Sequence, residues 1–184
     1  LTSASTPSFT SVLGNTNNVS FDNTNSTIQE RTAYYAVNKI HAHLKSIFPT
    51  FNDLDIPLET NVDESGTCNA FFSGNSINFY SAGLSANGVD YCEATAKLVD
   101  VVYHEYGHAI NGNLYVGSSW SGNMSNGALN EGYADIWSFT ITEDPILGIG
   151  FYQNNPNGYV RRYDVNKKVY PQDLVGEVHA DVRS

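Results

Sequence analysis

The chain of 184 residues has few basic side chains and no long apolar segment. Only nine Lys and Arg stand against 19 Asp and Glu, which gives a net charge of −10. Because nucleic acids and anionic membranes are polyanions, this balance predicts that neither is a partner. No apolar run approaches the roughly 20 residues that a membrane-spanning helix needs, so no membrane span is predicted.

Cysteine is also scarce, since Cys68 and Cys92 are the only two. This count excludes a scaffold held by several disulfides and leaves two alternatives, one disulfide or two buried thiols. We favour the disulfide, which fits an oxidising compartment and predicts a secreted, extracellular protein. The chain begins at Leu1 without a signal peptide, which favours a mature or excised segment.

Enough apolar residues are present to form a core, because hydrophobic residues make up 41% and aromatic residues 12%. Residues 1–25 are rich in Ser, Thr and Asn without periodicity and are predicted to form a polar linker or arm. Residues 26–184 are predicted to form one folded lobe. Within it we expect a helix from its cap Ser26 to Pro49, a hairpin of strands 69–72 and 77–80 around Ser73-Gly74, a helix over 94–111 stopped by Gly112, a helix over 128–142, and little regular structure over 146–184.

The strongest chemical signal is the segment His104-Glu105-Tyr106-Gly107-His108 in the second predicted helix. Residues four apart share one helix face with Cβ atoms about 5–6 Å apart, so two imidazoles can reach one cation. Glu105 can then act as general base on a water at that cation. A helix with stray polar residues is disfavoured, because Leu98 to Tyr103 is apolar except for Asp100 and the polar face would lie buried without a partner.

Glu131, on the next predicted helix, is the candidate third ligand. Asp135 follows on the same helix face and can accept a hydrogen bond from the outer nitrogen of a ligand histidine. Alone, such an acidic pair is usually a solvated face, but one loop after the histidine motif it predicts a zinc site. His41 and His43 lie two apart, face different directions, and are predicted to be surface or packing residues.

Three segments resemble the thermolysin-like gluzincin peptidases and their fungalysin relatives. Residues 100–108 are similar to the zinc helix of that family, residues 127–135 to its third-ligand helix, and residues 69–72 to the edge strand that holds the substrate. The resemblance covers residues 26–142. It implies a zincin-like α+β lobe, in which a twisted mixed sheet with an antiparallel edge strand packs on the zinc helix.

The resemblance also implies roles at the metal and on the substrate. His104, His108 and Glu131 would bind Zn²⁺, Glu105 would be the general base, and Asp135 and Asn130 would support the ligands. Asn69, Ala70 and Phe71 would hold a polypeptide substrate as an added strand, and Val101 would line an apolar pocket. A Cys68–Cys92 bond would brace this cleft.

The resemblance implies three further roles. His179 resembles the histidine that donates a hydrogen bond to the oxyanion, with either Asp173 or Glu177 orienting it. Arg162 resembles the arginine that holds a substrate carbonyl. Asp100 resembles a ligand for Ca²⁺ that Glu143 and Asp144 would join, although a solvated acidic pair explains the last two equally well.

The favoured function is therefore a zinc-dependent endopeptidase. The family continues into a largely helical second lobe, which we expect this chain to lack and which would then be a missing partner. The alternatives are an inactive module that binds zinc and peptide, against which the presence of Glu105 weighs, and a zinc exopeptidase.

Overall fold

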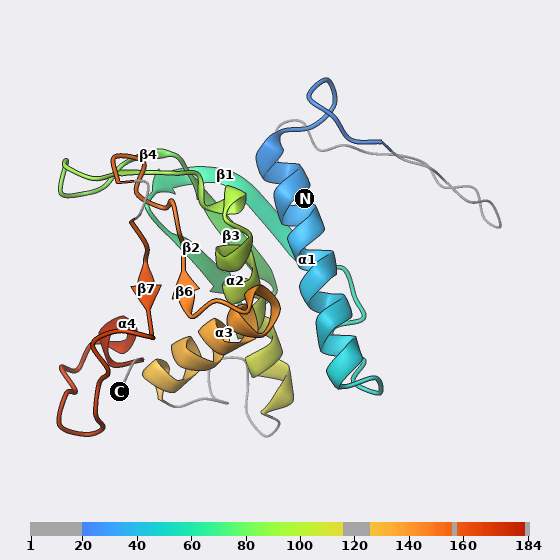
Figure 1. The fold of residues 1–184 in the computed structure, drawn as a ribbon. Helices are drawn as coiled ribbons and strands as arrows, with labels where there is room; N and C mark the ends of the chain where they lie inside the picture. Colours follow the sequence, from blue (N-terminus) through green and yellow to red (C-terminus); the bar gives the residue numbers. More distant parts are fainter. Residues whose placement is uncertain (1–19, 116–125, 156–157, 183–184) are drawn as a thin grey trace.

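The computed structural model describes residues 20–115, 126–155 and 158–182 (Figure 1). Over these ranges the chain has a mixed α+β fold, as predicted. No helix in them is long and apolar enough to cross a membrane. Most of the predicted arm, residues 1–19, lies outside the described residues. The elements are α1 (Ile28–Ile47), β1 (Glu59–Thr67), β2 (Ala70–Ser73), β3 (Ser76–Ser81), β4 (Gly83–Leu84), β5 (Tyr91–Cys92), the short 3-10 helix η1 (Thr95–Lys97), α2 (Val99–Leu114), α3 (Gly127–Thr142), β6 (Ile146–Leu147), β7 (Arg161–Arg162) and α4 (Val178–Asp181).

Helix α1 begins one residue later than predicted, with Thr27 rather than Ser26 as its cap. The Thr27 hydroxyl accepts a hydrogen bond from the Glu30 N–H, and the Glu30 carboxylate accepts one from the Thr27 N–H at 2.6 Å. This reciprocal pair satisfies two N–H groups that a helix start leaves free. The Ser26 hydroxyl instead donates to the Asp22 carbonyl at 2.8 Å.

The main sheet has three strands in the order β1-β3-β2. β1 runs parallel to β3, whereas β2 runs antiparallel to β3 with Ala70 opposite Phe79 and Ser73 opposite Ser76. Gly74 takes a φ of 63° in the turn between β2 and β3, a backbone conformation that glycine adopts without strain. The predicted hairpin and the antiparallel edge strand of a mixed sheet are thus confirmed.

The core lies between one face of this sheet and helices α1 and α2. Side chains alternate along a strand, so Ile77 and Phe79 of β3 point to the same side. On α1 the inward residues recur every three or four positions, which places them on one helix face. This stripe consists of Ala33, Ala36, Ile40 and Leu44, all buried.

Helices α2 and α3 pack closely, and Gly107 allows this. A Cβ atom at Gly107 would lie 2.9 Å from the Ala134 Cα and 3.0 Å from its carbonyl oxygen. Glycine in a helix costs about 1 kcal/mol relative to alanine, so its place between the two histidines reflects this helix contact. The predicted stop at Gly112 is wrong, because α2 continues to Leu114 and its start is delayed to Val99 by η1.

Residues 146–182 contain more structure than their weak periodicity indicated. β6 and β7 pair antiparallel, with Leu147 opposite Arg161. The Asp100 carboxylate, in the first turn of α2, accepts a hydrogen bond from the Gly148 N–H at 2.6 Å. This bond anchors the β6–β7 pair beside α2, a long-range contact that local sequence patterns do not encode.

Candidate metal centre

A cavity of about 710 Å³ lies beside α2 and collects most of the predicted site residues. One wall is the edge strand with the residue before it, and another is formed by apolar side chains from α2 and the β6–β7 region. Polar groups of α2, α3 and α4 complete it. The lining includes Cys68, Asn69, Ala70, Phe71, Phe72, Val101, His104, Glu105, His108, Asn130, Glu131, Leu147, Phe151, Val160, Arg161, Glu177 and His179.

Two imidazoles and one carboxylate converge in this cavity. His104 Nε2 lies 3.1 Å from His108 Nε2 and 3.3 Å from Glu131 Oε2. His108 Nε2 lies 3.6 Å from Glu131 Oε1. Ligand atoms that sit about 2.0–2.1 Å from one tetrahedral ion are roughly 3.3 Å apart, so these separations suit a shared ion. Ligand atoms of His104, Glu105 and His108 also lie within 4.8 Å of one another, and this group could hold a metal ion.

The outer nitrogens of both histidines have partners, which turns the inner nitrogens toward this centre. His104 Nδ1 lies 2.6 Å from Asp135 Oδ1, and His108 Nδ1 lies 3.3 Å from Asn130 Oδ1. A carboxylate or carbonyl acceptor at the outer nitrogen fixes ring orientation and increases the basicity of the inner nitrogen. The structure therefore places Asp135 and Asn130 where supporting residues are needed.

The electrostatics of the centre call for a cation. Glu131 Oε2 is buried and has no hydrogen-bond partner among the described residues, so its approach to His104 is an ion pair without hydrogen-bond geometry. Burial lowers the pKa of His104, but Asp135 and Glu131 together raise it to about 10. Burial and the charge of His104 lower the pKa of His108 to about 4. One proton on His104 thus supplies the positive charge that a metal ion would otherwise bring.

Glu105 has the properties of a proton acceptor and donor. Its side chain follows His104 directly and is only 4% exposed. Burial raises the pKa of Glu105 to about 7, with the Glu131 charge adding to the rise and the His104 charge opposing it. A carboxyl group with a pKa near neutrality can both take up and return a proton during one reaction.

Asn111 and Trp137 form a support that sequence reasoning missed. Asn111 Nδ2 donates to Asn130 Oδ1 and to the Asn130 carbonyl, each at 3.0 Å. Trp137 Nε1 donates to Asn111 Oδ1 at 3.2 Å. Trp137 therefore fixes the orientation of the Asn111 amide, and Asn111 in turn fixes the Asn130 amide that contacts His108. In the sequence, Asn111 lies three residues after His108 on the same helix face, and this spacing indicates that the two side chains lie close together.

Arg161, rather than the predicted Arg162, belongs to the site. Arg161 holds Asp135 with two hydrogen bonds, from Nε to Oδ2 at 2.7 Å and from Nη2 to Oδ1 at 2.8 Å. Although burial raises the pKa of Asp135, His104 and Arg161 hold it well below its usual range. Arg162 instead pairs with Asp164 and does not line the cavity. Neighbouring side chains of a strand point to opposite faces, so Arg161 faces the cavity whereas Arg162 points away from it.

His179 reaches the rim of the cavity from α4. Its Nδ1 lies 3.0 Å from Glu177 Oε1, and its Nε2 lies 3.4 Å from Glu131 Oε1. The bond to Glu131 raises the pKa of His179 to about 9. Of the two predicted orienting residues, Glu177 contacts His179, whereas Asp173 accepts a hydrogen bond from the Val169 N–H.

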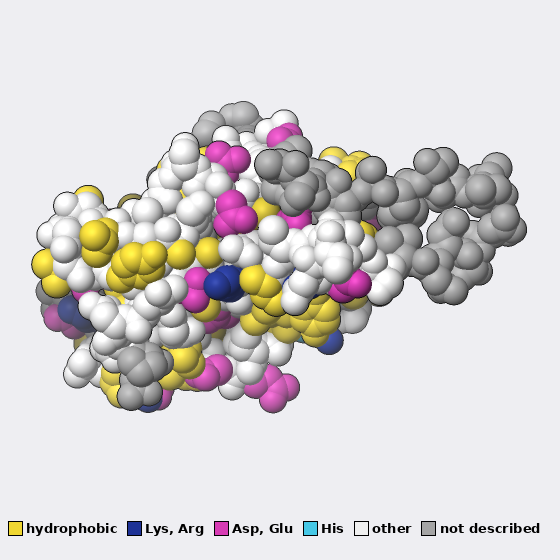
Figure 2. All heavy atoms as spheres, turned by 90° about the horizontal axis from the view of Figure 1, so that it is seen from above, with side chains coloured by type: hydrophobic (Ala, Val, Ile, Leu, Met, Phe, Trp, Pro, Cys, Tyr) yellow, Lys and Arg dark blue, Asp and Glu magenta, His cyan; other side chains and the backbone are white. Residues whose placement is uncertain are grey.

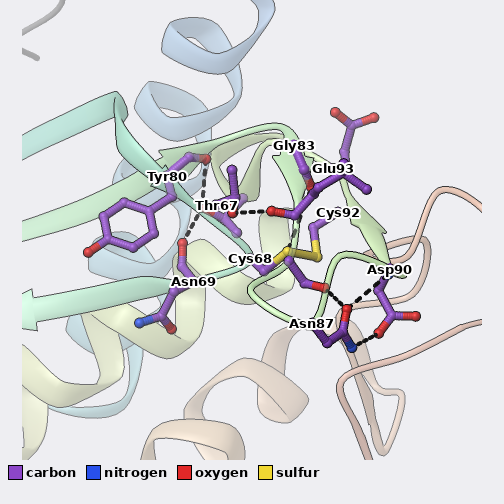
Figure 3. The surroundings of a disulfide bond; sticks show 12 residues. Thr67, Cys68, Asn69, Tyr80, Gly83, Asn87, Asp90, Cys92 and Glu93 are labelled. Carbon is purple, nitrogen blue, oxygen red and sulfur yellow. Dashed lines mark hydrogen bonds between the residues drawn. A yellow bond between two sulfur atoms is a disulfide. The ribbon is translucent and has the colours of Figure 1, made fainter.

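The predicted disulfide between Cys68 and Cys92 is present, with a Cα–Cα distance of 5.2 Å (Figure 3). Cys68 precedes the edge strand, and the neighbouring Asn69 carbonyl accepts a hydrogen bond from the Tyr80 N–H at 3.2 Å. Beside Cys92, the Glu93 N–H donates to the Phe151 carbonyl at 2.8 Å. Since Cys68 and Phe151 line the same cavity, the disulfide connects its two walls.

The predicted calcium ligands do not gather into a site. In the described part of the chain, His104, Glu105 and His108 are the only group of three or more such residues with metal-ligand spacing. The Asp100 carboxylate accepts hydrogen bonds from the Gly148 and Val101 N–H groups, so it serves the backbone instead. His41 and His43 contact Asp55 and Thr140, as packing or surface residues do.

No protein-family model matches this sequence, and a search of curated proteins finds no relative.

Proposed function

We propose that this chain is a zinc-dependent endopeptidase of the thermolysin-like gluzincin type. The observation that carries the proposal is the convergence of His104, His108 and Glu131 within 3.1–3.6 Å of one another, in the cavity that also holds Glu105. The adjoining edge strand β2 supplies a surface on which an extended peptide could pair.

The donor set favours zinc. Two imidazole nitrogens and one carboxylate, with a fourth position left open, are a ligand set of catalytic zinc sites. When bound, zinc would polarise the scissile carbonyl and lower the pKa of a water molecule toward neutrality.

The side chains of this protein would divide the remaining chemistry among them. The Glu105 carboxylate accepts a proton from the attacking water and returns it to the leaving amine. His179, whose Nε2 lies 3.4 Å from Glu131 Oε1 at the rim of the cavity, donates a hydrogen bond to the carbonyl oxygen as it gains negative charge. Val101, Leu147 and Phe151 offer apolar contacts to a substrate side chain.

The test compares the wild type with Glu105→Gln in casein and furylacryloyl-peptide assays. Glu105→Gln should keep its zinc and lose about 10²–10⁴ in rate, because only the proton acceptor is removed. Chelator should abolish wild-type turnover and zinc should restore it. Glu143→Gln, a change at an exposed position, is the matched control and should behave as the wild type.

Other results would favour the alternatives. Zinc bound with no turnover in either protein indicates a binding module. Mass spectrometry that finds only end-trimmed products indicates an exopeptidase. Failure to bind zinc removes the proposal altogether. We also propose that the protein acts outside the cell, because a structural disulfide persists in oxidising compartments.

A further inference from the structure

A second cavity, of about 450 Å³, is built from α1, the segment before β1, β1 itself and α2. It shares no lining residue with the candidate metal centre. Tyr106, its contribution from α2, stands between Glu105 and Gly107. Successive helix residues point about 100° apart, so Tyr106 leaves α2 on a different side from its neighbour Glu105.

Tyr106 brings to this cavity a phenol hydroxyl without a hydrogen-bond partner among the described residues. The residue is 2% exposed, and its hydroxyl makes no hydrogen bond to any residue of the described ranges. Burial and the negative charge of Asp55 raise the pKa of Tyr106, so the phenol stays neutral and able to donate. A phenol hydroxyl that reaches a cavity can donate a hydrogen bond to water or to an acceptor of a bound molecule.

Among the residues that line this cavity, Asp55 is the one carboxylate, and its charge is compensated by neighbouring side chains. Asp55 is already paired, with His41 Nε2 and Lys45 Nζ each 2.9 Å from its oxygens. Most of the remaining lining is apolar, including Val37 and Leu58. At the rim, Tyr34 and Ile56 are exposed although both are apolar, and Ile56 is 65% exposed. Because the one carboxylate of this mixed apolar and polar lining is already paired, the cavity favours a neutral ligand over an ion.

We propose that this cavity binds a small neutral molecule with an aromatic or branched aliphatic body and a carbonyl oxygen that accepts the Tyr106 hydroxyl. Its volume lies in the lower part of the range of about 300–1,000 Å³ for small-molecule sites, so an aromatic amide is a suitable size. This site depends neither on a metal nor on peptidase activity.

The test titrates acetanilide into the isotope-labelled full chain and follows backbone amide shifts by NMR. We expect saturable shifts centred on Tyr34, Thr60 and Tyr106. Tyr106→Phe keeps the ring and removes the donor, so it should weaken binding about three- to tenfold. Tyr35→Phe removes a hydroxyl from an exposed tyrosine of α1 outside the cavity and should leave affinity unchanged.

A second variant guards against misfolding of Tyr106→Phe. Ile56→Ala lies on the exposed rim and should also weaken acetanilide binding without affecting the core. The proposal is overturned if no saturable shift occurs, if the shifts centre on His104 and His108, or if both variants bind as the wild type does. Binding of a peptide but not of acetanilide would overturn it too, in favour of a peptide partner.

Discussion

The protonation state of His104 should affect how strongly the candidate metal centre binds a metal ion. At neutral pH His104, with its pKa raised to about 10, carries a proton, whereas His108, with its pKa lowered to about 4, does not. A metal ion must displace the His104 proton to reach Nε2. Proton and metal therefore compete at one nitrogen.

The expected consequence is a release of about one proton for each zinc bound at neutral pH. The affinity for zinc should rise with pH up to about pH 10, the pKa of His104, because a smaller fraction of His104 is then protonated and the metal displaces fewer protons. An ordinary histidine would reach this limit near pH 6.5. Calorimetry in two buffers with different ionisation enthalpies measures the released protons. Asp135→Asn should reduce the release, and zinc binding without proton release would contradict this account.

Asn111 should affect metal affinity without touching the metal. Asn111→Leu removes the donor to Asn130 Oδ1, which then loses its fixed orientation toward His108 Nδ1. Loss of such a supporting contact typically weakens metal binding about 10–100-fold. Competition with a fluorescent chelator measures the change, while circular dichroism checks the fold.

The matched control is Asn113→Leu, whose side chain bonds only to the Ala109 carbonyl of its own helix among the described residues. It should bind zinc as the wild type does. Equal zinc affinity in Asn111→Leu and Asn113→Leu would show that the Asn111 contact does not position His108.

Among the elements, β5 is joined to the segment just before β2 by the bond between Cys92 and Cys68. The closed loop is short, with a sequence separation of 24. Cross-linking a loop of this length stabilises a fold by about 3 kcal/mol, chiefly by restricting the unfolded chain.

Reduction of this bond should therefore lower the free energy of unfolding by about 3 kcal/mol and weaken substrate binding, because the cavity walls lose their link. Urea unfolding with and without reductant measures the first effect, and KM for a peptide measures the second. The double variant Cys68→Ala/Cys92→Ala should match the reduced wild type and be unaffected by reductant. Equal stability in both redox states would count against a bracing role.

At the scale of the whole molecule, acidic side chains are spread over the face seen in Figure 2, where basic ones are few. The net charge of −10 makes approach to another polyanion unfavourable. We expect no binding to duplex DNA or to phosphatidylserine vesicles, even at low salt where attraction between opposite charges is strongest. Fluorescence anisotropy and vesicle sedimentation measure this, and saturable binding to either would contradict the prediction.

The sequence by itself determined the features that depend on neighbouring residues. His104 and His108 face one point because helical geometry places residues four apart on the same face. The β2–β3 hairpin follows from its turn and flanking strands. The two cysteines left a choice between one disulfide and two buried thiols, and the favoured disulfide is present.

Only the tertiary structure decided contacts between distant segments. It selected Arg161 over Arg162, since the direction of a short strand depends on how β7 pairs with β6. It assigned Asp100 to the Gly148 backbone, and it joined Asn111 to Trp137 through the packing of α2 on α3. Local spacing fixes which side of a helix a residue occupies, but only packing fixes what that side meets.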